Sequence, residues 1–585
     1  MDFKLINERT YDSALVQVLC NRGINVNDIT HFLNTTDDDV NSYMRFGENN
    51  LKQGLSAILH TINDNKPCIV IVDSDADGYT SAAIMINYLY DLFPTWVESK
   101  LTWFIHEGKQ HGLSDFQLEE GSGGLIICPD SSSNDYVQHK ELKEHGWQVL
   151  VLDHHEAEKV SEDAIIINNQ LCDYPNKFLS GAGVTWQFCK FIDNATDNNY
   201  ADHYLDLVAL GLTADMMSMQ SLETKHLINK GFKYSNLKNP FVYGMAKNHK
   251  YNLGEGDITY MGAAFYIAPF VNAMVRSGTK SEKQLLFKSM LKFEAFKEVP
   301  STKRGHKAGD IEIVYEQAIR VATNVKRRQT KSQDAGMDLI EHLIEKNNML
   351  DNKILLFLLD EGRLDKNIAG LIANKIVAKY NRPVCILMKG NYDNKLVYSG
   401  SARGCDATGV RDFKSVCEKC NGVIFAEGHP GAFGLCLEAD KTNDFLENIN
   451  ELLKDVNDIS CYTVDLSYCN DNVKAQDILD IAVHPELWGK DVDEPLVAIY
   501  NLKIVSSMVQ VYEKTTNTIR IHLPESNLDL VMFKASEEQC KELQPDGYIE
   551  INVIGKCVTN EWQGLVKPQL LIQDYEIIDS NKYFF

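Results

Sequence analysis

The chain has 585 residues, a formal net charge of −24 and 44% hydrophobic residues, so it is long enough for several domains with cores of their own. It contains no apolar stretch of membrane-helix length, and the polar start MDFKLINERT does not resemble a signal peptide; we expect neither a membrane protein nor a secreted one. The 14 cysteines are scattered, mostly in apolar runs. This pattern indicates reduced thiols and a cytoplasmic location.

Residues from about 1 to 50 are predicted to be helical, and strands then alternate with helices to about residue 240. The alternation predicts a parallel sheet with helices on both faces. The first clear strand, 67–72, is followed by three carboxylates at alternate positions and a glycine: Asp73, Asp75, Asp77 and Gly78. Like charges this close repel one another unless a cation neutralises them, and a divalent cation commonly does so.

Two other interpretations of this acidic segment must be weighed. Residues 73–78 begin like the calcium loop of a helix-loop-helix protein, but the twelfth position, which should be Glu, is Ile84, and a strand rather than a helix precedes the loop. A solvated acidic turn without a metal is the simpler alternative.

Three further apolar segments also end in Asp or His. They are 125–130, ending in Asp130; 148–155, ending in Asp153, His154 and His155; and 205–215, ending in Asp215. Ligands of open α/β sheets bind outside the carboxyl ends of the strands, so we expect these side chains to meet there. Carboxylate and imidazole groups suit Mn²⁺ or Mg²⁺ better than a metal that prefers thiolates.

These motifs carry a resemblance to a known family. The segments DSDADGYTSAA (73–83), IICPDSSS (126–133), DHH (153–155) and LVALGLTAD (207–215) resemble the DHH phosphoesterase superfamily. With residues 18–24 and LSGAGV (179–184), the chain most resembles RecJ, the single-strand-specific exonucleases. The resemblance extends over nearly the whole chain.

The resemblance implies two divalent metal ions, Mn²⁺ or Mg²⁺. It assigns the ligands to Asp73, Asp75, Asp77, Asp130, His154 and Asp215. It also makes Asp153 and His155 catalytic candidates, with His155 contacting the scissile phosphate or protonating the leaving oxygen.

Residues 268–276 match a substrate-contacting motif of this family at Asn272 and Arg276, but Phe270 replaces the Arg that follows the proline. Ordinary polar contacts are the alternative for both residues. The breaker-poor stretch 312–348 resembles the long helix that joins the two RecJ lobes, and 298–307 resembles a mobile loop.

A second α/β unit starts near residue 353. Its segments 399–403 and 427–434 match two signatures of the DHH-associated domain, and the substrate-binding candidates are Ser399, Gly400, Arg403, Gly428 and His429. Glycine lets a ligand approach the backbone, and Arg or His can grip phosphate, although glycine-rich turns alone are more often structural. Leu364 and Asp365 replace a Trp-His pair of the family.

From about residue 490, five short β-rich stretches suit an OB barrel: 496–500, 518–522, 530–533, 548–554 and 568–572. Tyr512 and Trp562 are candidates for base stacking, with a core role as the alternative.

The negative net charge disfavours a nucleic-acid enzyme, because phosphate groups are bound by Lys and Arg. Two basic clusters, either DNA tracks or solvated helix faces, are Lys303, Arg304 and Lys307, and Lys326, Arg327, Arg328 and Lys331. The lone C-x-x-C at Cys417 and Cys420 lacks the second pair that zinc requires.

We therefore expect an α/β protein with these parts: an N-terminal helical segment (1–50), a DHH catalytic domain (51–285), an insert and linking helix (286–350), a DHH-associated substrate-binding lobe (351–458), and a linker with an OB-like β-barrel (459–585). By the resemblance, it is a monomeric, metal-dependent exonuclease of DNA recombination and repair. It would digest single-stranded DNA from 5′ to 3′ into nucleoside 5′-monophosphates, with a single-strand-binding protein or a helicase as a partner.

Two alternatives remain open. One is a DHH phosphodiesterase for short oligonucleotides or cyclic dinucleotides, which the OB-like tail disfavours because a short substrate needs no strand track. The other is an inactive nucleic-acid-binding replication factor, which the complete carboxylate set disfavours.

Overall fold

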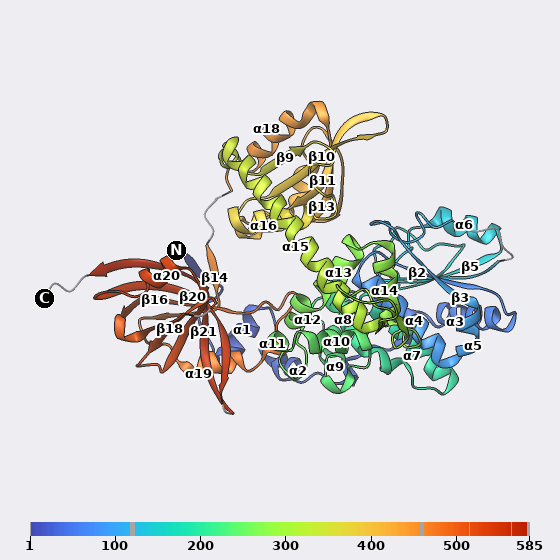
Figure 1. The fold of residues 1–585 in the computed structure, drawn as a ribbon, viewed down its shortest axis with the longest axis horizontal. Helices are drawn as coiled ribbons and strands as arrows, with labels where there is room; N and C mark the ends of the chain where they lie inside the picture. The colour runs from blue at the N-terminus through green and yellow to red at the C-terminus, as the bar shows by residue number, and fades with distance from the viewer. Residues whose placement is uncertain (1, 118–122, 457–460, 514, 563, 582–585) are drawn as a thin grey trace. The chain divides into compact units, whose positions relative to one another are not determined.

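The computed structural model describes residues 2–117, 123–456, 461–513, 515–562 and 564–581. The chain divides into two compact units, coloured along the chain in Figure 1. The larger unit consists of Asn7–Lys326 and Tyr468–Phe585, and the smaller unit of Met1–Ile6 and Arg327–Ser467. Each unit is described by itself below.

The larger unit contains a five-stranded sheet in the order β3-β2-β4-β5-β6, and every neighbouring pair is parallel. The strands are β2 (Cys68–Val72), β3 (Leu101–Ile105), β4 (Gly124–Pro129), β5 (Trp147–Asp153) and β6 (Ile165–Asn168). Their β-branched residues are almost entirely buried, as expected for a parallel sheet covered on both faces.

Helices cover both faces of this sheet, as the sequence predicted. Along β5, Val149 and Val151 pack in one core with Leu142 of α6 (Tyr136–Glu144). Leu150 points the other way, toward Gly54 of α3 (Glu48–Asn63), which also lies against Phe188 of α7 (Gly181–Thr196). This alternation follows from the two-residue period of a strand.

A group of helices follows the sheet: α8 (Leu205–Ala214), α9 (Leu222–Gly231), α10 (Pro240–Asn248), α11 (Lys250–Leu253), α12 (Tyr260–Tyr266), α13 (Ala268–Ser277) and α14 (Lys280–Met290). The apolar segment 205–215 is therefore a helix, unlike the three strand segments that end in ligand candidates. Helix α8 is buried on all sides, so its sequence has no polar face to reveal the helical period. The first 50 residues contain α1 (Ala14–Asn21), α2 (Ile29–Leu33) and short 3-10 turns, and also a strand, β1 (Phe3–Leu5).

The insert before the long helix is a small hairpin rather than an open loop. Strands β7 (Glu298–Pro300) and β8 (Ile311–Ile313) pair antiparallel, and α15 (Val314–Lys346) follows directly. This helix confirms the long helical segment predicted at 312–348.

The C-terminal region of the larger unit is a β-rich domain. Its seven-stranded sheet has the order β15-β16-β20-β21-β19-β18-β17. The bounds are β15 (Leu466–Cys469), β16 (Leu496–Val505), β17 (Val509–Tyr512), β18 (Asn517–Leu523), β19 (Leu528–Ala535), β20 (Tyr548–Trp562) and β21 (Leu565–Asn581). Each of the five predicted strands lies on one of these, but β20 and β21 are longer than the short strands expected.

The smaller unit is built on a sheet in the order β12-β13-β11-β10-β9. The strands are β9 (Leu355–Leu359), β10 (Val384–Tyr392), β11 (Lys395–Arg403), β12 (Val423–His429) and β13 (Ala432–Glu438). One face packs against α16 (Ala369–Tyr380), and the other against α17 (Phe413–Glu418) and α18 (Thr442–Leu452). At another place in this unit, β1 pairs in parallel with β14 (Tyr462–Val464).

None of the described helices is long and apolar enough to span a bilayer. All 14 cysteines are free, and Cys417 and Cys420 lie buried in the smaller unit. The domain boundaries given above remain predictions.

Candidate metal centre

The three carboxylates after β2 surround the start of a helix, α4 (Ala76–Leu92). Asp75 is its N-cap and accepts a hydrogen bond from the Gly78 N–H at 2.9 Å. Gly78 is required here, because a Cβ on it would lie 2.5 Å from the Cβ of Asp73. The turn thereby packs Asp73 and Asp77, both buried, close to Asp75.

Asp130 follows β4 and is buried among the other candidate ligands. It is 1% exposed, and neither of its oxygens receives a hydrogen bond within the described part of the chain. Its backbone has φ +65°, a left-handed conformation that is strained for a residue with a side chain. A buried carboxylate without donors is costly, so this arrangement calls for a cation.

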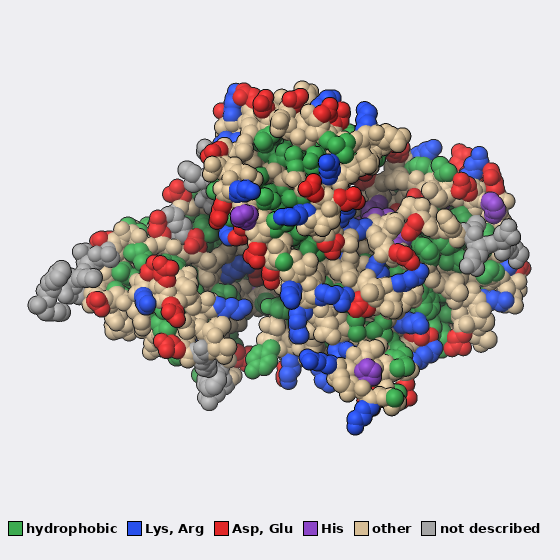
Figure 2. Space-filling model, turned by 45° about the horizontal axis from the view of Figure 1, so that its top comes forward, with side chains coloured by type: hydrophobic (Ala, Val, Ile, Leu, Met, Phe, Trp, Pro, Cys, Tyr) green, Lys and Arg blue, Asp and Glu red, His purple; other side chains and the backbone are tan. Residues whose placement is uncertain are grey.

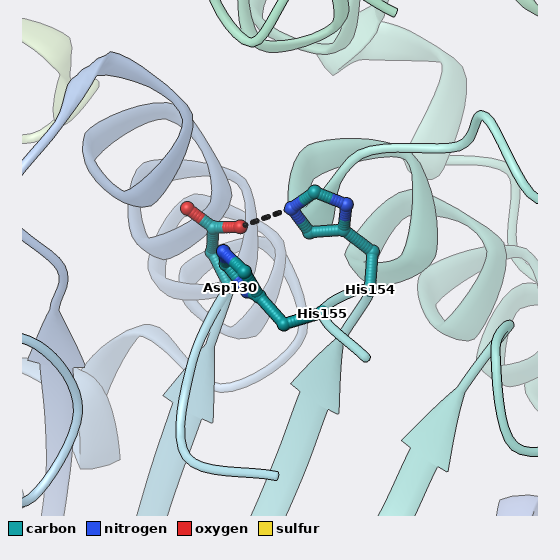
Figure 3. A group of neighbouring side chains, drawn as sticks. All are labelled: Asp130, His154 and His155. Atoms are coloured by element: carbon teal, nitrogen blue, oxygen red, sulfur yellow. Dashed lines mark ion pairs between the residues drawn. The ribbon is translucent and has the colours of Figure 1, made fainter. Parts of the chain in front are cut away.

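His154, after β5, brings a nitrogen ligand to the same place. Its Nε2 lies 3.2 Å from Asp130 Oδ1 and 3.4 Å from Asp215 Oδ2, and Asp215 caps the C-terminal end of α8. Figure 3 shows Asp130 and His154 pointing toward one another, with His155 beside them.

The candidate ligands form overlapping groups within the part of the chain that the structure describes. The groups are Asp73, Asp75 and Asp130; Asp77, His154 and Asp215; and Asp130, His154 and His155. Within each group the ligand atoms all lie within 4.8 Å of one another, and no group contains a cysteine. All six predicted metal ligands are therefore brought together, and Asp130 is common to two of the groups.

The N-terminal end of α7 holds Asp77 in position. Its carboxylate accepts hydrogen bonds from the Gly181 N–H at 2.7 Å, the Ala182 N–H at 3.2 Å and the Ser180 hydroxyl at 2.9 Å. A Cβ on Gly181 would lie 2.4 Å from Asp130 Oδ1. The motif at 179–184 therefore supplies hydrogen-bond donors to Asp77 and leaves space for the carboxylate of Asp130.

Burial and mutual repulsion raise the pKa of these carboxyl groups. For Asp130, burial is the largest cause, followed by the charges of Asp77, Asp75 and Asp73. Burial likewise raises the pKa of Asp75, Asp77 and Asp215. Since a nearby divalent cation favours the ionised form, the donor set fits Mn²⁺ or Mg²⁺ on charge and on ligand type.

Asp153 orients His155 rather than joining the ligand groups. Its Oδ1 accepts from His155 Nδ1 at 2.8 Å and from the backbone N–H groups of His154 and His155, while Oδ2 accepts from the Ser133 N–H. Burial acts to lower the pKa of His155, but the hydrogen bond and charge of Asp153 raise it to about 9. Burial acts to raise the pKa of Asp153, yet His155 holds it below its usual value.

Two histidines near this centre were not predicted from the sequence. His111 Nδ1 lies 2.7 Å from Asp73 Oδ2, and the Gly112 N–H donates to the other oxygen of Asp73. His106, directly after β3, is buried, with Nδ1 2.6 Å from Asp115 and Nε2 4.0 Å from Asp73 Oδ1. The signal was available, since β3 is another strand that ends in a potential ligand.

Asn272 and Arg276 lie on α13, which packs against α4 and α8, the helices that carry Asp77 and Asp215. Asn272 Oδ1 is buried and has no hydrogen-bond partner in the described structure, while Arg276 is exposed. Phe270, the departure from the family motif, contacts the His249 ring, with centroids 4.7 Å apart and planes tilted by 52°.

Three substrate-binding candidates of the smaller unit, Arg403, Gly428 and His429, lie at one end of its sheet, while Ser399 and Gly400 lie in the middle of β11. Arg403 on β11 and His429 on β12 both pair with Ala432 of β13, the strand between them. Gly400 has no room for a side chain, because a Cβ would lie 2.1 Å from the Ile386 carbonyl oxygen. Gly428 has φ +126°, which also favours glycine.

The residues at the family's Trp-His positions have structural roles here. Leu364 is buried in the core against α16. The Asp365 side chain accepts from the Asn367 N–H at 2.8 Å. Neither contributes a ring to the surface.

Comparisons with known proteins agree with this geometry. Residues 67–212 match the model of the DHH family, N-terminal domain, and residues 467–574 match that of the RecJ OB domain. The chain is 33% identical to YorK of Bacillus subtilis, provisionally named an SPbeta prophage-derived single-strand DNA-specific exonuclease, over 100% of this chain and 99% of that protein. It is 26% identical to the single-stranded-DNA-specific exonuclease RecJ of Bacillus subtilis, over 98% of this chain and 69% of that protein.

Solved structures show the same fold. The crystal structure of RecJ from Thermus thermophilus in complex with Mn²⁺ matches with a TM-score of 0.66 and 17% identity, covering 91% of this chain and 72% of that one. With the full-length similarity to YorK and the two matched domains, this shows that the chain belongs to the RecJ family of the DHH superfamily.

Proposed function

We propose that this protein is a divalent-metal-dependent exonuclease that hydrolyses phosphodiester bonds of single-stranded DNA. The observation that carries the proposal is the convergence of six Asp and His ligands on one edge of the sheet, around a buried Asp130 that has no hydrogen-bond donor among the described residues. Family membership and the names of the relatives supply the substrate class.

In this proposal two ions are held by overlapping ligand sets. One set is Asp77, Asp130, His154 and Asp215, and the other is Asp73, Asp75 and Asp130. A bound divalent ion supplies Lewis-acid stabilisation of charge on phosphate oxygens and lowers the pKa of a nearby water. The relatives from Thermus thermophilus were solved with Mn²⁺ and with Mg²⁺, which supports either metal.

His155 has the features of a proton donor to the leaving oxygen or of a contact to the scissile phosphate. Asp153 fixes its ring through Nδ1, which leaves Nε2 for the substrate. Asp153 is thus a positioning residue, and His155 is the catalytic one.

Substrate contacts are assigned to two places. Asn272 and Arg276 lie on the helix next to the metal ligands. In the smaller unit, Ser399, Gly400 and Arg403 follow one another along β11, and Gly428 and His429 lie at the end of β12; backbone groups, Arg and His can hold phosphate there.

The OB domain and the basic residues would retain a long strand. Tyr512 is 45% exposed on β17 and suits base stacking, whereas the side chain of Trp562 lies outside the described residues. In the first basic cluster, Lys303 lies 3.5 Å from Glu312 and is partly neutralised. The OB domain favours long strands over short oligonucleotides or cyclic dinucleotides, and the complete ligand set favours an enzyme over an inactive replication factor.

The direction of digestion, the products and the cellular process are inferred from the family resemblance. We expect digestion from 5′ to 3′, release of nucleoside 5′-monophosphates, a monomer, and work in recombination or repair beside a helicase or a single-strand-binding protein. The free cysteines support a cytoplasmic setting.

The decisive experiment is digestion of end-labelled single strands with the 5′ end or the 3′ end blocked in turn, in Mn²⁺ and in EDTA. We expect hydrolysis only with metal, stopped only by the 5′ block, with blunt duplexes nearly untouched. Efficient cleavage of dinucleotides together with inactivity on long strands would instead establish the small-substrate phosphodiesterase. Asp130→Asn is the matched inactive control.

A further inference from the structure

One segment of the larger unit has a charge opposite to that of the whole chain. Residues 224–254 contain six lysines and no Asp or Glu, in a chain with 82 acidic and 58 basic residues. Lys225 is buried with its ammonium group on the Phe32 carbonyl, and Lys230 pairs with Asp37. The remaining four are exposed, and we call them the lysine surface: Lys233, Lys238, Lys247 and Lys250.

The charges of the lysine surface are largely uncompensated. Lys233, Lys238 and Lys247 have no ion-pair partner among the residues that the structure describes, and Lys250 lies 3.8 Å from Glu255. On the face drawn in Figure 2, Lys and Arg side chains likewise gather in places despite the acidic total. Uncompensated ammonium groups close together attract a polyanion.

An aromatic pocket opens beside two of these lysines, Lys247 and Lys250. It has a volume of about 390 Å³, and its lining includes Tyr234, Tyr243, Lys247, Lys250 and Ile258, with one acidic residue, Glu255. The two tyrosine rings have centroids 6.1 Å apart and planes tilted by 54°, with hydroxyl oxygens 3.4 Å apart. A pocket of this volume falls within the range of small-molecule sites and is large enough for a nucleobase.

The local fold holds this pocket open. Tyr243 and Lys247 are one helical turn apart on α10, so they share one face of that helix. Tyr234 is held by its backbone N–H, which donates to Asp257 at 2.9 Å. Gly254 and Gly256 line the rim with open space where a Cβ would lie, so a ligand can approach their backbone. The Tyr251 ring is 98% exposed on the adjacent α11.

The pocket and the metal centre belong to the same unit. The pocket lining runs up to Ile258, just before α12, and α12 packs against α8, which ends at Asp215. A strand bound at the pocket would therefore be held by the unit that carries the metal ligands.

We propose that this pocket and the lysine surface bind single-stranded nucleic acid outside the metal centre. A base lies against Tyr234 and Tyr243, and backbone phosphates lie against Lys247 and Lys250. A single strand offers both an unpaired base and adjacent phosphates. In a duplex the bases are already stacked and paired, and an acidic peptide has no base to stack on the two tyrosine rings. This inference rests on the proposed function and extends it to a second strand-binding site.

The test measures binding rather than hydrolysis. A labelled oligothymidylate of about 20 nucleotides is titrated in EDTA and followed by fluorescence anisotropy at several salt concentrations. The variants are Tyr234→Ala, Tyr243→Ala and the double variant Lys247→Gln with Lys250→Gln. Lys140→Gln, an exposed lysine of α6, is the matched control.

We expect each tyrosine variant to weaken binding about tenfold, the scale of one lost base stack. The double lysine variant should lower the slope of log K against log salt by roughly 0.7 per lost phosphate contact. Tyr243→Phe should bind as well as the wild type, because stacking needs the ring and not the hydroxyl. The control should leave both affinity and slope unchanged.

The failures are distinguishable. A wild-type protein that neither binds nor digests single strands contradicts the proposed function itself. A wild-type protein that digests single strands, with pocket variants that bind them normally, contradicts only this inference. So does displacement of the oligonucleotide by a polyglutamate peptide of equal charge at equal concentration, which would identify an acidic protein as the ligand. Tyr234 is half-exposed, so its variant remains informative if Tyr243→Ala fails to fold.

Discussion

Asp130 and Glu312 are two buried carboxylates in one unit with opposite surroundings. Asp130 is 1% exposed and has no donor within the described residues. The Glu312 side chain is 2% exposed and has several: the Arg320 guanidinium at 2.6 and 3.0 Å, and Gln317, the Ser301 hydroxyl and the Thr302 N–H, each at 3.0 Å. Within the described residues, Glu312 is paired with the Arg320 guanidinium, whereas Asp130 makes no hydrogen bond and has the His154 ring, 3.2 Å away, as its ion-pair partner.

The titration of the two groups differs accordingly. Burial and four neighbouring aspartates raise the pKa of Asp130 well above its usual range. Burial also acts to raise the pKa of Glu312, but the hydrogen bonds led by Arg320 lower it below its usual range. Glu312 therefore stabilises the β7–β8 hairpin, whereas Asp130 destabilises the metal-free fold in exchange for a binding site.

The largest expected effect comes from removing the carboxylate charge of Asp130, whose ion-pair partner is the His154 ring at 3.2 Å. Asp130→Asn should reduce hydrolysis of single-stranded DNA by more than about a hundredfold, since even partners of metal ligands cost up to that much. In EDTA the same variant should melt at a higher temperature than the wild type, because one repelling charge is gone. Mn²⁺ should raise the melting temperature of the wild type much more than that of the variant. A variant that loses both activity and stability would show that Asp130 is a structural group.

The converse change removes the charge of Glu312, which is paired with Arg320. Glu312→Gln should destabilise the larger unit by about 2–3 kcal/mol, the scale of hydrogen bonds to a charged group, with Mn²⁺ affinity unchanged. Denaturant unfolding and metal titration measure the two quantities. Equal losses of stability and of metal affinity would contradict the contrast between the two carboxylates.

The pH dependence of stability should separate Glu312 from its glutamine variant. Because the folded pKa is lowered from 4.5, the stabilisation by Glu312 is fully present above that pH and is lost as pH falls through the folded pKa. The difference in unfolding free energy between wild type and Glu312→Gln should therefore be constant from about pH 5 to 7 and shrink in acid. A difference that grows in acid would contradict the direction of the shift.

A smaller effect is expected from steric change beside the metal centre. Gly181→Ala places a Cβ 2.4 Å from Asp130 Oδ1, and the ligand must move, so we expect about a tenfold loss of Mn²⁺ affinity, as for other changes around ligands. Gly434→Ala in the smaller unit is the matched control, because its Cβ would meet its nearest atoms at an ordinary 3.7 Å. Equal effects in both variants would mean that general packing, not ligand placement, explains the loss.

The smallest effect on activity is expected from Arg403 and His429, the proposed phosphate contacts of the smaller unit. Arg403→Ala and His429→Ala should raise KM for single strands roughly threefold to tenfold, as for the loss of one solvent-accessible hydrogen bond of about 1 kcal/mol, with Mn²⁺ affinity unchanged. Arg403→Lys should recover part of the loss, because Lys keeps the charge without the planar fork. Loss of metal affinity with normal KM would contradict the assignment of these residues to substrate.

The sequence was sufficient for the features that repeat along the chain. Three strands that end in Asp or His predicted both the sheet and its ligand edge, since the strand period and the parallel order leave little freedom. It was insufficient for α8, whose apolar residues are buried on every side and therefore show no period. His106 was predictable as the residue that follows β3, whereas the role of His111 depends on how the 106–115 loop folds back onto Asp73.

The local sequence also did not predict the full lengths of β20 and β21 or the pocket beside the lysine surface. Strands β20 and β21 extend beyond their apolar centres through polar residues that only cross-strand pairing makes part of the sheet. The lysine surface is visible in the sequence as the acid-free stretch 224–254, but only the folded positions of Tyr234 and Tyr243 turn it into a pocket.

The pairing of β1 with β14 has a consequence for folding during synthesis. Phe3 pairs with Tyr462, which is made 459 residues later. At a synthesis rate of about 5–20 residues per second, the first strand waits roughly 20–90 s for its partner. The sheet of the larger unit, whose strands lie within residues 68–168, can form in that interval. The smaller unit, to which both strands belong, is thus completed late in synthesis, after the sheet of the larger unit can already have formed.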